Sequence, residues 1–223
     1  MLRKIRHFVS SRSFLKCYGT DSRNYYKKSG RMTIRMIGVG NGGCNILDDI
    51  QKDEYYAEAT FVYCDDNTDD LNKHGKGSDC KLLLNMEQPN DFLFADESID
   101  LTIIASALGG RTTSTFTAQI TEACRKQSKM VLGAIAMPFA TEGQQCVDTA
   151  KQVLEALKPL YDALLIQYND LIPGNLLISD MNDPLCSGLK RLCLAMNESK
   201  VYDLNALSTE DTIDIISKGL VIE

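Results

Sequence analysis

Residues 33–50 read TIRMIGVGNGGCNILDDI, and this stretch decides the fold. A short apolar run over residues 34–37 stops at a glycine, which is typical of a buried parallel strand that enters a tight turn. Gly38, Gly40 and Gly43 fit the spacing G-x-G-x-x-G. Glycine allows positive φ and close approach of a ligand, and a following helix directs free N–H groups at phosphate. The stretch therefore predicts a nucleotide site, although glycine also serves in ordinary strand-to-helix turns.

The composition limits the fold and the class of partner. At 223 residues, of which 44% are hydrophobic, the chain has room for one sizeable α/β domain. No apolar run in the sequence is long enough to span a bilayer. Residues 1–31 hold nine of the 24 Lys and Arg and one of the 30 acids, so their charge is +8 and the remainder, from the net −6, carries −14. An acidic body argues against nucleic acid as the main partner.

The eight cysteines include no C-x-x-C pair, and several lie inside apolar runs, as buried reduced thiols do. This usage predicts a reducing compartment. With only His7 and His74 as histidines, a cysteine-rich metal site is not expected.

Residues 1–31 are basic, serine-bearing and nearly free of acids, and we expect them to lie outside the fold. Three interpretations remain open: a transit peptide, which would make the protein organellar, a disordered basic arm, or an extension from a mis-assigned start codon with Met32 as the true first residue. We prefer the last, which makes the protein cytoplasmic. The domain itself is then expected over residues 32–223.

The apolar runs and breakers predict an α/β domain of Rossmann-like type, an open parallel sheet with helices on both faces. After the first strand, strands are expected over residues 60–64, 81–85, 101–105, 130–136, 163–167 and 220–222. Helices are expected over residues 44–56, 116–126, 142–158, 182–197 and 208–217. Thr141 is the expected N-cap of the third of these helices. Residues at helical spacing in the fourth predict a core-facing stripe: Leu185, Leu189, Leu192 and Met196.

A second glycine turn follows the strand expected over residues 101–105. It consists of Gly109, Gly110 and Arg111, and residues 112–115 then supply four hydroxyl groups before a helix. Hydroxyls, exposed amides and an arginine at a helix start would form an anion cradle, whereas threonine N-capping would account for only one hydroxyl. Two such turns on neighbouring strands indicate one ligand with several phosphates.

Acidic residues follow the strand expected over residues 60–64. Asp65 and Asp66 would lie at the carboxyl ends of the strands, where ligands bind in an open parallel sheet. In a dinucleotide enzyme one of them would hold a ribose hydroxyl, which keeps an NAD-dependent Rossmann enzyme as an alternative. A capped turn is the other interpretation, since Asp and Asn favour such positions.

The order of these elements and loops resembles the tubulin/FtsZ family, specifically the GTP-binding domain of FtsZ. The segments that carry the resemblance are IRMIGVGNGGCNILDDI (34–50), FVYCDD (61–66), ASALGGRTTST (105–115), MPFATEG (137–143), YNDL (168–171) and EDTIDIISKGLV (210–221). MPFATEG is the most specific of them, because an NAD-type domain has no reason to carry it. The likeness extends from about Met32 to the end of the chain.

The resemblance implies a site for GTP or GDP. The residues expected to face the phosphates are Gly38, Gly40, Asn41, Gly42, Gly109, Gly110, Thr112 and Ser114, with Arg111 adding charge. Pro138 and Glu142 would border the ribose, and Asn169 would bond the guanine base. Asp211 corresponds to an acid that reaches the nucleotide of the next subunit and helps to activate water. Hydrolysis would also need Mg²⁺, which no dedicated protein cage is expected to hold.

The sequence also departs from the family pattern. Arg111 replaces the third glycine of the signature loop, Thr113 and Thr115 replace its two later glycines, and the second domain of FtsZ has no counterpart in the matching region. The leading interpretation is an FtsZ-like guanine-nucleotide-binding protein, with GTPase activity left open, that acts in cell division or filament assembly. The alternative is a non-catalytic regulator that caps or copolymerises with full-length FtsZ. Its protein partner would be itself or that FtsZ.

Deletion of residues 1–31 tests the expectation that the tail lies outside the fold. We expect the melting temperature of the shortened chain to stay close to that of the full chain, because a segment that buries no core contributes little to stability. Thermal unfolding followed by circular dichroism measures this. A large drop would show that the tail packs on the domain.

Overall fold

The computed structural model describes residues 9–10, 13–14, 33–76, 79–86, 99–172, 177, 180–198 and 220–222. Within the basic tail, β1 (Val9–Ser10) pairs antiparallel with β2 (Ser13–Phe14). The helix expected over residues 208–217, and Asp211 with it, lies outside the described residues.

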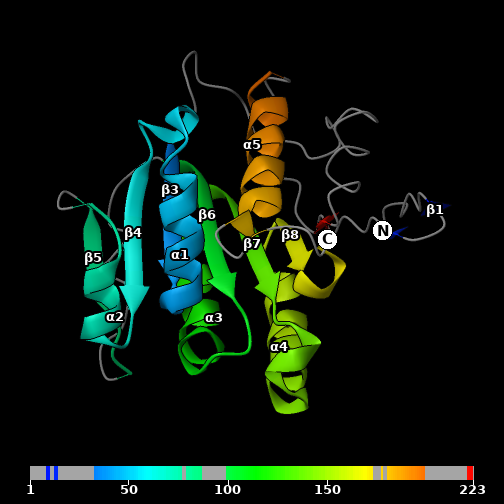
Figure 1. Cartoon of the computed structure of the whole chain (residues 1–223). Helices are drawn as coiled ribbons and strands as arrows, with labels where there is room; N and C mark the ends of the chain where they lie inside the picture. The colour runs from blue at the N-terminus through cyan, green and yellow to red at the C-terminus, as the bar shows by residue number, and fades with distance from the viewer. Residues whose placement is uncertain are drawn as a thin grey trace.

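One sheet of seven strands forms the centre of the domain, in the order β5-β4-β3-β6-β7-β8-β9 (Figure 1). The strands are β3 (Ile34–Val39), β4 (Thr60–Asp65), β5 (Cys80–Leu83), β6 (Ile99–Ala107), β7 (Ser128–Met137), β8 (Ala163–Tyr168) and β9 (Leu220–Ile222). The six strands from β3 to β8 are mutually parallel, and β9 pairs antiparallel with β8. The predicted open parallel sheet is confirmed, with an antiparallel strand added at one edge.

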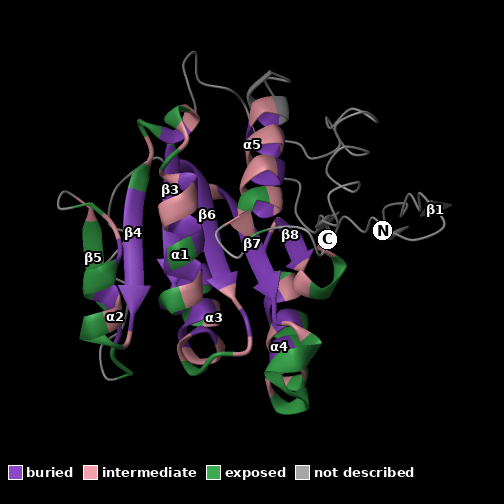
Figure 2. Cartoon of the chain, in the orientation of Figure 1, coloured by how far each residue is buried: buried purple, intermediate pink, exposed green. Residues whose placement is uncertain are grey.

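Helices cover both faces of the sheet, also as predicted. The core on one face contains apolar residues of α1 (Gly40–Ile50), α2 (Thr68–Lys73) and α5 (Asp183–Glu198). The core on the other face contains those of α3 (Arg111–Arg125) and α4 (Gln144–Leu157). Figure 2 shows β3, β4, β6, β7 and β8 largely buried between these layers, whereas the edge strand β5 is mostly exposed. Neighbouring residues such as Met36 and Ile37 enter opposite cores, because side chains alternate along a strand.

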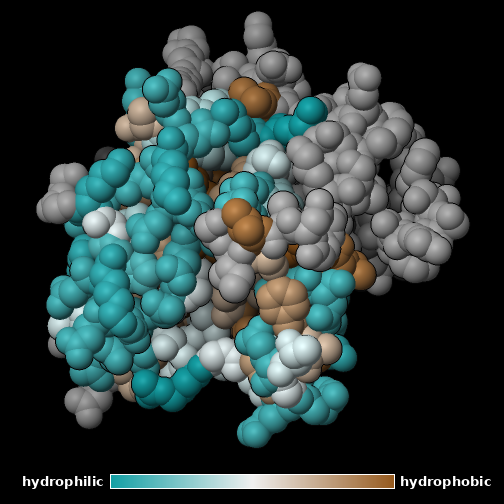
Figure 3. Space-filling model, in the orientation of Figure 1, coloured by the Kyte–Doolittle hydropathy of each residue, from teal (hydrophilic) through white to brown (hydrophobic). Residues whose placement is uncertain are grey.

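The predicted apolar stripe of α5 is confirmed: Leu185, Leu189, Leu192 and Met196 are at most 2% exposed. The face shown in Figure 3 is mostly hydrophilic over α1, α2 and β5. Among the described residues, no helix is both long and apolar enough to cross a membrane.

Several predicted boundaries were wrong, and glycine explains two of them. The first helix ends at Ile50 rather than at residue 56. α1 begins at Gly40 rather than residue 44, because Gly40 turns the chain at φ +72° directly from strand to helix. Thr141 is not an N-cap: it lies in a 3₁₀ turn, Ala140–Glu142, which Gly143 at φ +105° separates from α4. Helix α3 begins at Arg111 rather than after residue 115, so the hydroxyls of residues 112–115 belong to its first turns.

The order in which strands are added to the sheet reverses between β3 and β6. The strands that follow β3 in sequence build outward on one side, as β4 and β5, and the later strands build on the other side from β6. In an open α/β sheet, ligands bind outside the carboxyl ends of the strands at such a switch point. Both glycine turns of the sequence lie here, because one follows β3 and the other follows β6.

Helix α1 packs unusually close to the sheet at this point, and glycine makes that possible. A Cβ atom on Gly43 would lie 2.4 Å from the carbonyl oxygen of Ala105 in β6. A Cβ atom on Gly38 in β3 would lie 2.9 Å from the carbonyl oxygen of Gly43. Both contacts are with backbone, which cannot rotate away, so Gly38 and Gly43 are needed for packing.

The variant Gly43→Ala tests this packing. We expect it to lower the free energy of unfolding by about 2 kcal/mol or more, because the new methyl group overlaps backbone of β6. Denaturant unfolding measures the change. Asn45→Ala is the matched control, since Asn45 is exposed on the same helix and alanine favours a helix; equal stability of the two variants would contradict the packing role.

Candidate functional site

The residues predicted for the site lie in a row along the carboxyl edge of the sheet. The loops that carry them follow β3, β6, β7 and β8, which are consecutive neighbours. At about 4.8 Å between strands, the row spans roughly 14 Å. The structure thus brings together the residues of four separate sequence segments along one edge.

The first glycine turn connects β3 to α1 without an intervening loop. A Cβ atom on Gly40 would lie 3.1 Å from Cγ2 of Thr113 in α3, so the two glycine turns touch each other. The N-cap residue of α1, Val39, makes no side-chain capping bond, and Asn41 is exposed beside it. Gly42 is held against the sheet, since a Cβ atom there would lie 2.5 Å from Cβ of Ala107. Gly40 and Asn41 are therefore the members of this turn best placed to meet a ligand.

A buried histidine positions Asn41, and sequence reasoning missed it. Nε2 of His74 lies 2.9 Å from Oδ1 of Asn41, and its Nδ1 lies 2.7 Å from Oδ2 of Asp48 in α1. His74 is 4% exposed and its ring is nearly parallel to that of Tyr63. The only sequence signal is that the segment after β4 must return along α1, which does not specify this contact.

The second glycine turn has the backbone conformation that its glycines suggested. Gly109 adopts φ +103°, and Gly110 is the N-cap of α3, with no side-chain capping bond. Three of the four hydroxyls turn back to the helix: those of Thr113 and Ser114 donate to the carbonyl of Gly110, and that of Thr115 to the carbonyl of Arg111. These three bonds are those of a helix start, so a cradle of four free hydroxyls is not what the structure shows.

The fourth hydroxyl, on Thr112, meets Asp66 from the loop after β4. Thr112 Oγ1 donates to Oδ1 of Asp66 at 2.6 Å, and Nη2 of Arg111 pairs with Oδ2 at 2.7 Å. The carboxylate of Asp66 therefore bonds to both side chains that the second turn directs outward, the Thr112 hydroxyl and the Arg111 guanidinium. From the sequence, Asp66 was considered as an acid for a ribose or as part of a capped turn, so its place beside α3 was missed.

Asp65, next to it, is 2% exposed and does not reach this edge surface. Its Oδ1 accepts from the amide of Asn67 at 2.9 Å, while Oδ2 is buried without a hydrogen-bond partner in the described part of the chain. Burial raises the pKa of Asp65, the Asn67 amide lowers it, and the charge of Asp66 raises it further. Asp65 is thus poorly placed to hold a ribose hydroxyl.

The loop after β7 is tightly organised around Glu142. Its Oε1 accepts from the amide of Phe139 at 2.8 Å, and Oε2 lies 4.0 Å from Sγ of Cys146. Pro138 is buried, and Glu142 is exposed. A Cβ atom on Gly109 would lie 2.5 Å from the Cys146 sulfur, so this thiol abuts the second glycine turn. Burial, and secondly the Glu142 carboxylate, raises the pKa of Cys146.

Asn169 is held by a residue that sequence reasoning missed. Gln167, 1% exposed at the end of β8, donates from Nε2 to Oδ1 of Asn169 at 3.1 Å and to the carbonyl of Met181 at 3.0 Å. The carboxylate of Asp170 accepts from the amide of Ala140, which joins the loops after β7 and β8. The strand-end position of Gln167 was visible in the sequence, but its partner was not.

The structure leaves the proposed catalytic residue untested, because Asp211 lies outside the described residues. Within the described ranges, no three His, Cys, Asp or Glu side chains come together as a metal site would require. The seven cysteines in those ranges are free thiols.

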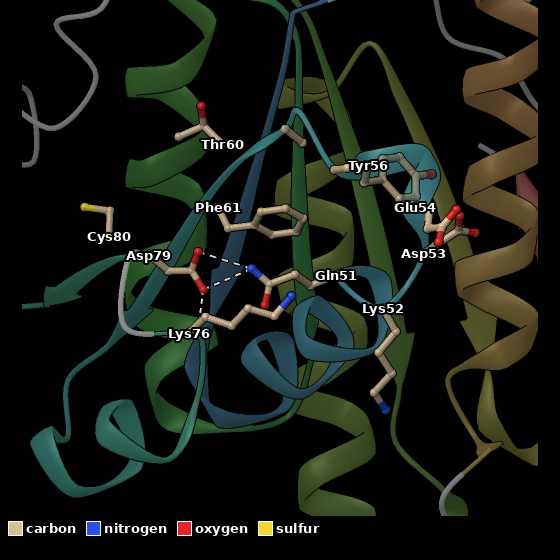
Figure 4. A pocket seen from close by; sticks show the side chains of 12 residues that line it. Gln51, Lys52, Asp53, Glu54, Tyr56, Thr60, Phe61, Lys76, Asp79 and Cys80 are labelled. Carbon is tan, nitrogen blue, oxygen red and sulfur yellow. Dashed lines mark hydrogen bonds between the residues drawn. The ribbon is translucent and has the colours of Figure 1, made fainter.

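A groove of about 630 Å³ lies elsewhere, at the amino ends of β4 and β5 (Figure 4). Its walls include Gln51, Phe61, Lys76, Asp79 and Cys80. Asp79 is already engaged there, since it accepts from Nε2 of Gln51 and from the amide of Lys76. Because the glycine turns and uncapped helix starts lie at the other edge, the carboxyl edge is the candidate functional site in preference to this groove.

Comparison with known proteins supports the resemblance seen in the sequence. No protein-family model matches the chain. The chain is 25% identical over 159 residues to the cell division protein FtsZ of Helicobacter pylori, covering 62% of this chain and 41% of that protein. It is 26% identical over 170 residues to the mitochondrial division protein fszB of Dictyostelium discoideum, covering 67% and 45%. The matches span less than half the length of these curated relatives.

Solved structures show the same fold. FtsZ from M. jannaschii, solved as an empty dimer, superposes with a TM-score of 0.63 at 20% identity, covering 77% of this chain and 57% of that one. CetZ2 from Haloferax volcanii, solved as a protofilament with bound GTPγS, gives 0.59 at 16% identity, covering 85% and 64%. The chain is therefore a divergent domain with the tubulin/FtsZ nucleotide-binding fold.

The contact between Glu142 and Cys146 predicts how the thiol reacts. In Glu142→Gln we expect the pH midpoint of Cys146 alkylation to move lower, because the carboxylate that raises the thiol pKa is gone. At pH 8 the alkylation rate should rise roughly twofold or more, since the thiolate is the reactive form. Peptide mass spectrometry separates Cys146 from the exposed Cys80.

Glu155→Gln is the matched control, because Glu155 is exposed on α4, the helix that carries Cys146, and pairs with Lys158 instead. It should leave the Cys146 midpoint in place. The same shift in both variants would contradict a specific effect of Glu142.

Proposed function

We propose that this chain is an FtsZ-like domain that binds GTP or GDP along the carboxyl edge of its sheet. The observation that carries the proposal is the pair of glycine turns at the switch point. Gly40 and Gly109 both have positive φ, and each turn leads to a helix whose N-cap residue makes no side-chain bond. Free amides at two touching helix starts favour an anion with more than one phosphate.

The row of loops fits the length and order of a nucleotide. The phosphates would meet Gly40, Asn41, Gly109 and Gly110 at the two turns. Pro138 and Glu142 would border the ribose one strand further along, and Asn169 would contact the base beyond β8. Gln167 fixes the Asn169 carbonyl, which leaves the amide group as a donor directed away from Gln167. Burial of Gly38 and the packing of Gly42 give these two residues a supporting role.

The assembly of the protein is a further part of the proposal. The relatives are a bacterial and a mitochondrial division protein, and one structure of this fold is a protofilament. We propose that the chain acts in filament assembly of the same kind, in the cytoplasm, with itself or a full-length FtsZ as partner. In the alternative it caps or copolymerises with that FtsZ as a regulator without turnover.

GTP hydrolysis would require Asp211 of one copy to act at the nucleotide of another. Mg²⁺ would be held chiefly by phosphate oxygens and water, since the described ranges offer no cluster of protein ligands. Arg111 could then add charge near the phosphates, provided that it leaves Asp66.

Nucleotide content and turnover of the purified full chain test the proposal. The protein is denatured, any released nucleotide is identified, and phosphate release from GTP with Mg²⁺ is followed at several protein concentrations. Bound guanine nucleotide supports the binding site, and turnover that rises more than linearly with protein supports a GTPase completed between copies. If neither GTP nor GDP binds while NAD does, the proposal is wrong.

Sedimentation separates self-assembly from the regulator. The chain is pelleted with GTP, alone and with a full-length FtsZ. Pelleting alone supports filaments of this chain. Pelleting only with FtsZ, or a reduced FtsZ pellet, supports the regulator.

The variant Asn169→Asp tests base recognition. Aspartate keeps the oxygen that accepts from Gln167 but replaces the amide donor with a charged oxygen, which would face the carbonyl of guanine. We expect the preference for GTP over ATP to fall roughly tenfold, as for a lost and opposed hydrogen bond. Gln119→Glu, an exposed amide-to-acid change on α3, is the control. An unchanged preference in Asn169→Asp would remove Asn169 from the base site.

A further inference from the structure

We propose that Asp66 occupies the position of the terminal phosphate of a nucleoside triphosphate. The site would then select a nucleoside diphosphate over a triphosphate. This inference rests on the proposed function, because it concerns the same nucleotide site. It assigns a specificity role to Asp66, which the sequence suggested only as an acid for a ribose or as part of a capped turn.

The contacts of Asp66 are those that a phosphate oxygen would make. One carboxylate oxygen accepts the Thr112 hydroxyl at 2.6 Å and the other pairs with Arg111 at 2.7 Å. Both partners belong to the first turn of α3, where the amide groups also favour an anion. The first turn of α3 contains no acidic residue of its own, so the negative charge at this helix start comes from the loop after β4.

Burial indicates which of the two paired side chains, Asp66 or Arg111, is free to move. The side chain of Asp66 is 11% exposed, whereas that of Arg111 is 81% exposed. Asp66 therefore stays close to the turn, and Arg111 is the partner with freedom to swing. The Thr113, Ser114 and Thr115 hydroxyls are bound to helix carbonyls, so Thr112 and Arg111 are the two side chains of this turn directed outward.

Nucleotides with two and three phosphates differ in how they meet this carboxylate. A diphosphate can bind the glycine turns with the Asp66 contacts intact. The additional phosphate of a triphosphate would approach Arg111 and Thr112, where it meets the carboxylate as a like charge or must displace it. Like charges opposed at a desolvated contact are costly, so the carboxylate lowers triphosphate affinity more than diphosphate affinity.

The test compares the affinities of GDP and GTPγS for the full chain, for Asp66→Asn and for Asp69→Asn, by calorimetric titration with Mg²⁺. Asparagine retains an oxygen for the Thr112 hydroxyl and removes the charge. Asp69 is an exposed acid three residues away, in α2, and serves as the charge-matched control. In Asp66→Asn we expect the ratio of GTPγS to GDP affinity to rise at least roughly fivefold, and in Asp69→Asn to stay within about twofold.

A second variant, Arg111→Ala, removes the partner and leaves the charge of Asp66 in place. It should lower GTPγS affinity more than GDP affinity, which is the opposite sign to Asp66→Asn. Thermal unfolding of each variant establishes that the proteins compared are folded.

The outcomes distinguish a failure of this inference from a failure of the proposed function on which it rests. If the parent binds guanine nucleotides and the affinity ratio of Asp66→Asn equals that of the parent, Asp66 is only a structural partner of α3 and the inference is wrong. If neither nucleotide binds the parent or Asp66→Asn, the proposed function fails and the inference fails with it.

Discussion

The close approach of α1 to β6 is the constraint on which the rest of the structure depends. Gly43 allows the helix backbone to rest on the carbonyl of Ala105, and Gly38 allows the preceding strand to pass beneath the same turn. With this spacing the N-terminus of α1 reaches the N-terminus of α3, where Gly40 touches Thr113. Larger residues at Gly38 or Gly43 would move the two helix starts apart, and their free amides could then no longer bind the same ligand.

The other loops at the carboxyl edge pack, one after another, against the N-termini of α1 and α3. The amide of Leu108 donates to the carbonyl of Ala136, Cys146 fills the space beside Gly109, and Asp170 holds the amide of Ala140. Each loop thus contacts the next one along the row. A displacement of one loop is transmitted to its neighbour through backbone hydrogen bonds and packing, which gives the site a stiffness that separate surface loops lack.

Sequence reasoning predicted the sheet, the helices α1, α3, α4 and α5, and the edge where the candidate site residues lie, because glycine spacing, apolar runs and strand-end loops are local signals. The short helix α2 was missed. It failed where the outcome depended on contacts between distant segments. The hydroxyls of residues 113–115 were read as free, since the sequence does not show that α3 begins at Arg111. Asp66, His74 and Gln167 were missed as partners of site residues, because the fold alone decides which loops meet.

The histidine behind the first turn has a consequence for the polarity of the site. The ring of His74 lies between two oxygens, with Oδ2 of Asp48 beside Nδ1 and Oδ1 of Asn41 beside Nε2. Because Oδ1 of Asn41 is turned toward the ring, its amide group is the end of the side chain left for a ligand. An anion at the first turn would therefore meet hydrogen-bond donors from a side chain as well as from the backbone of α1.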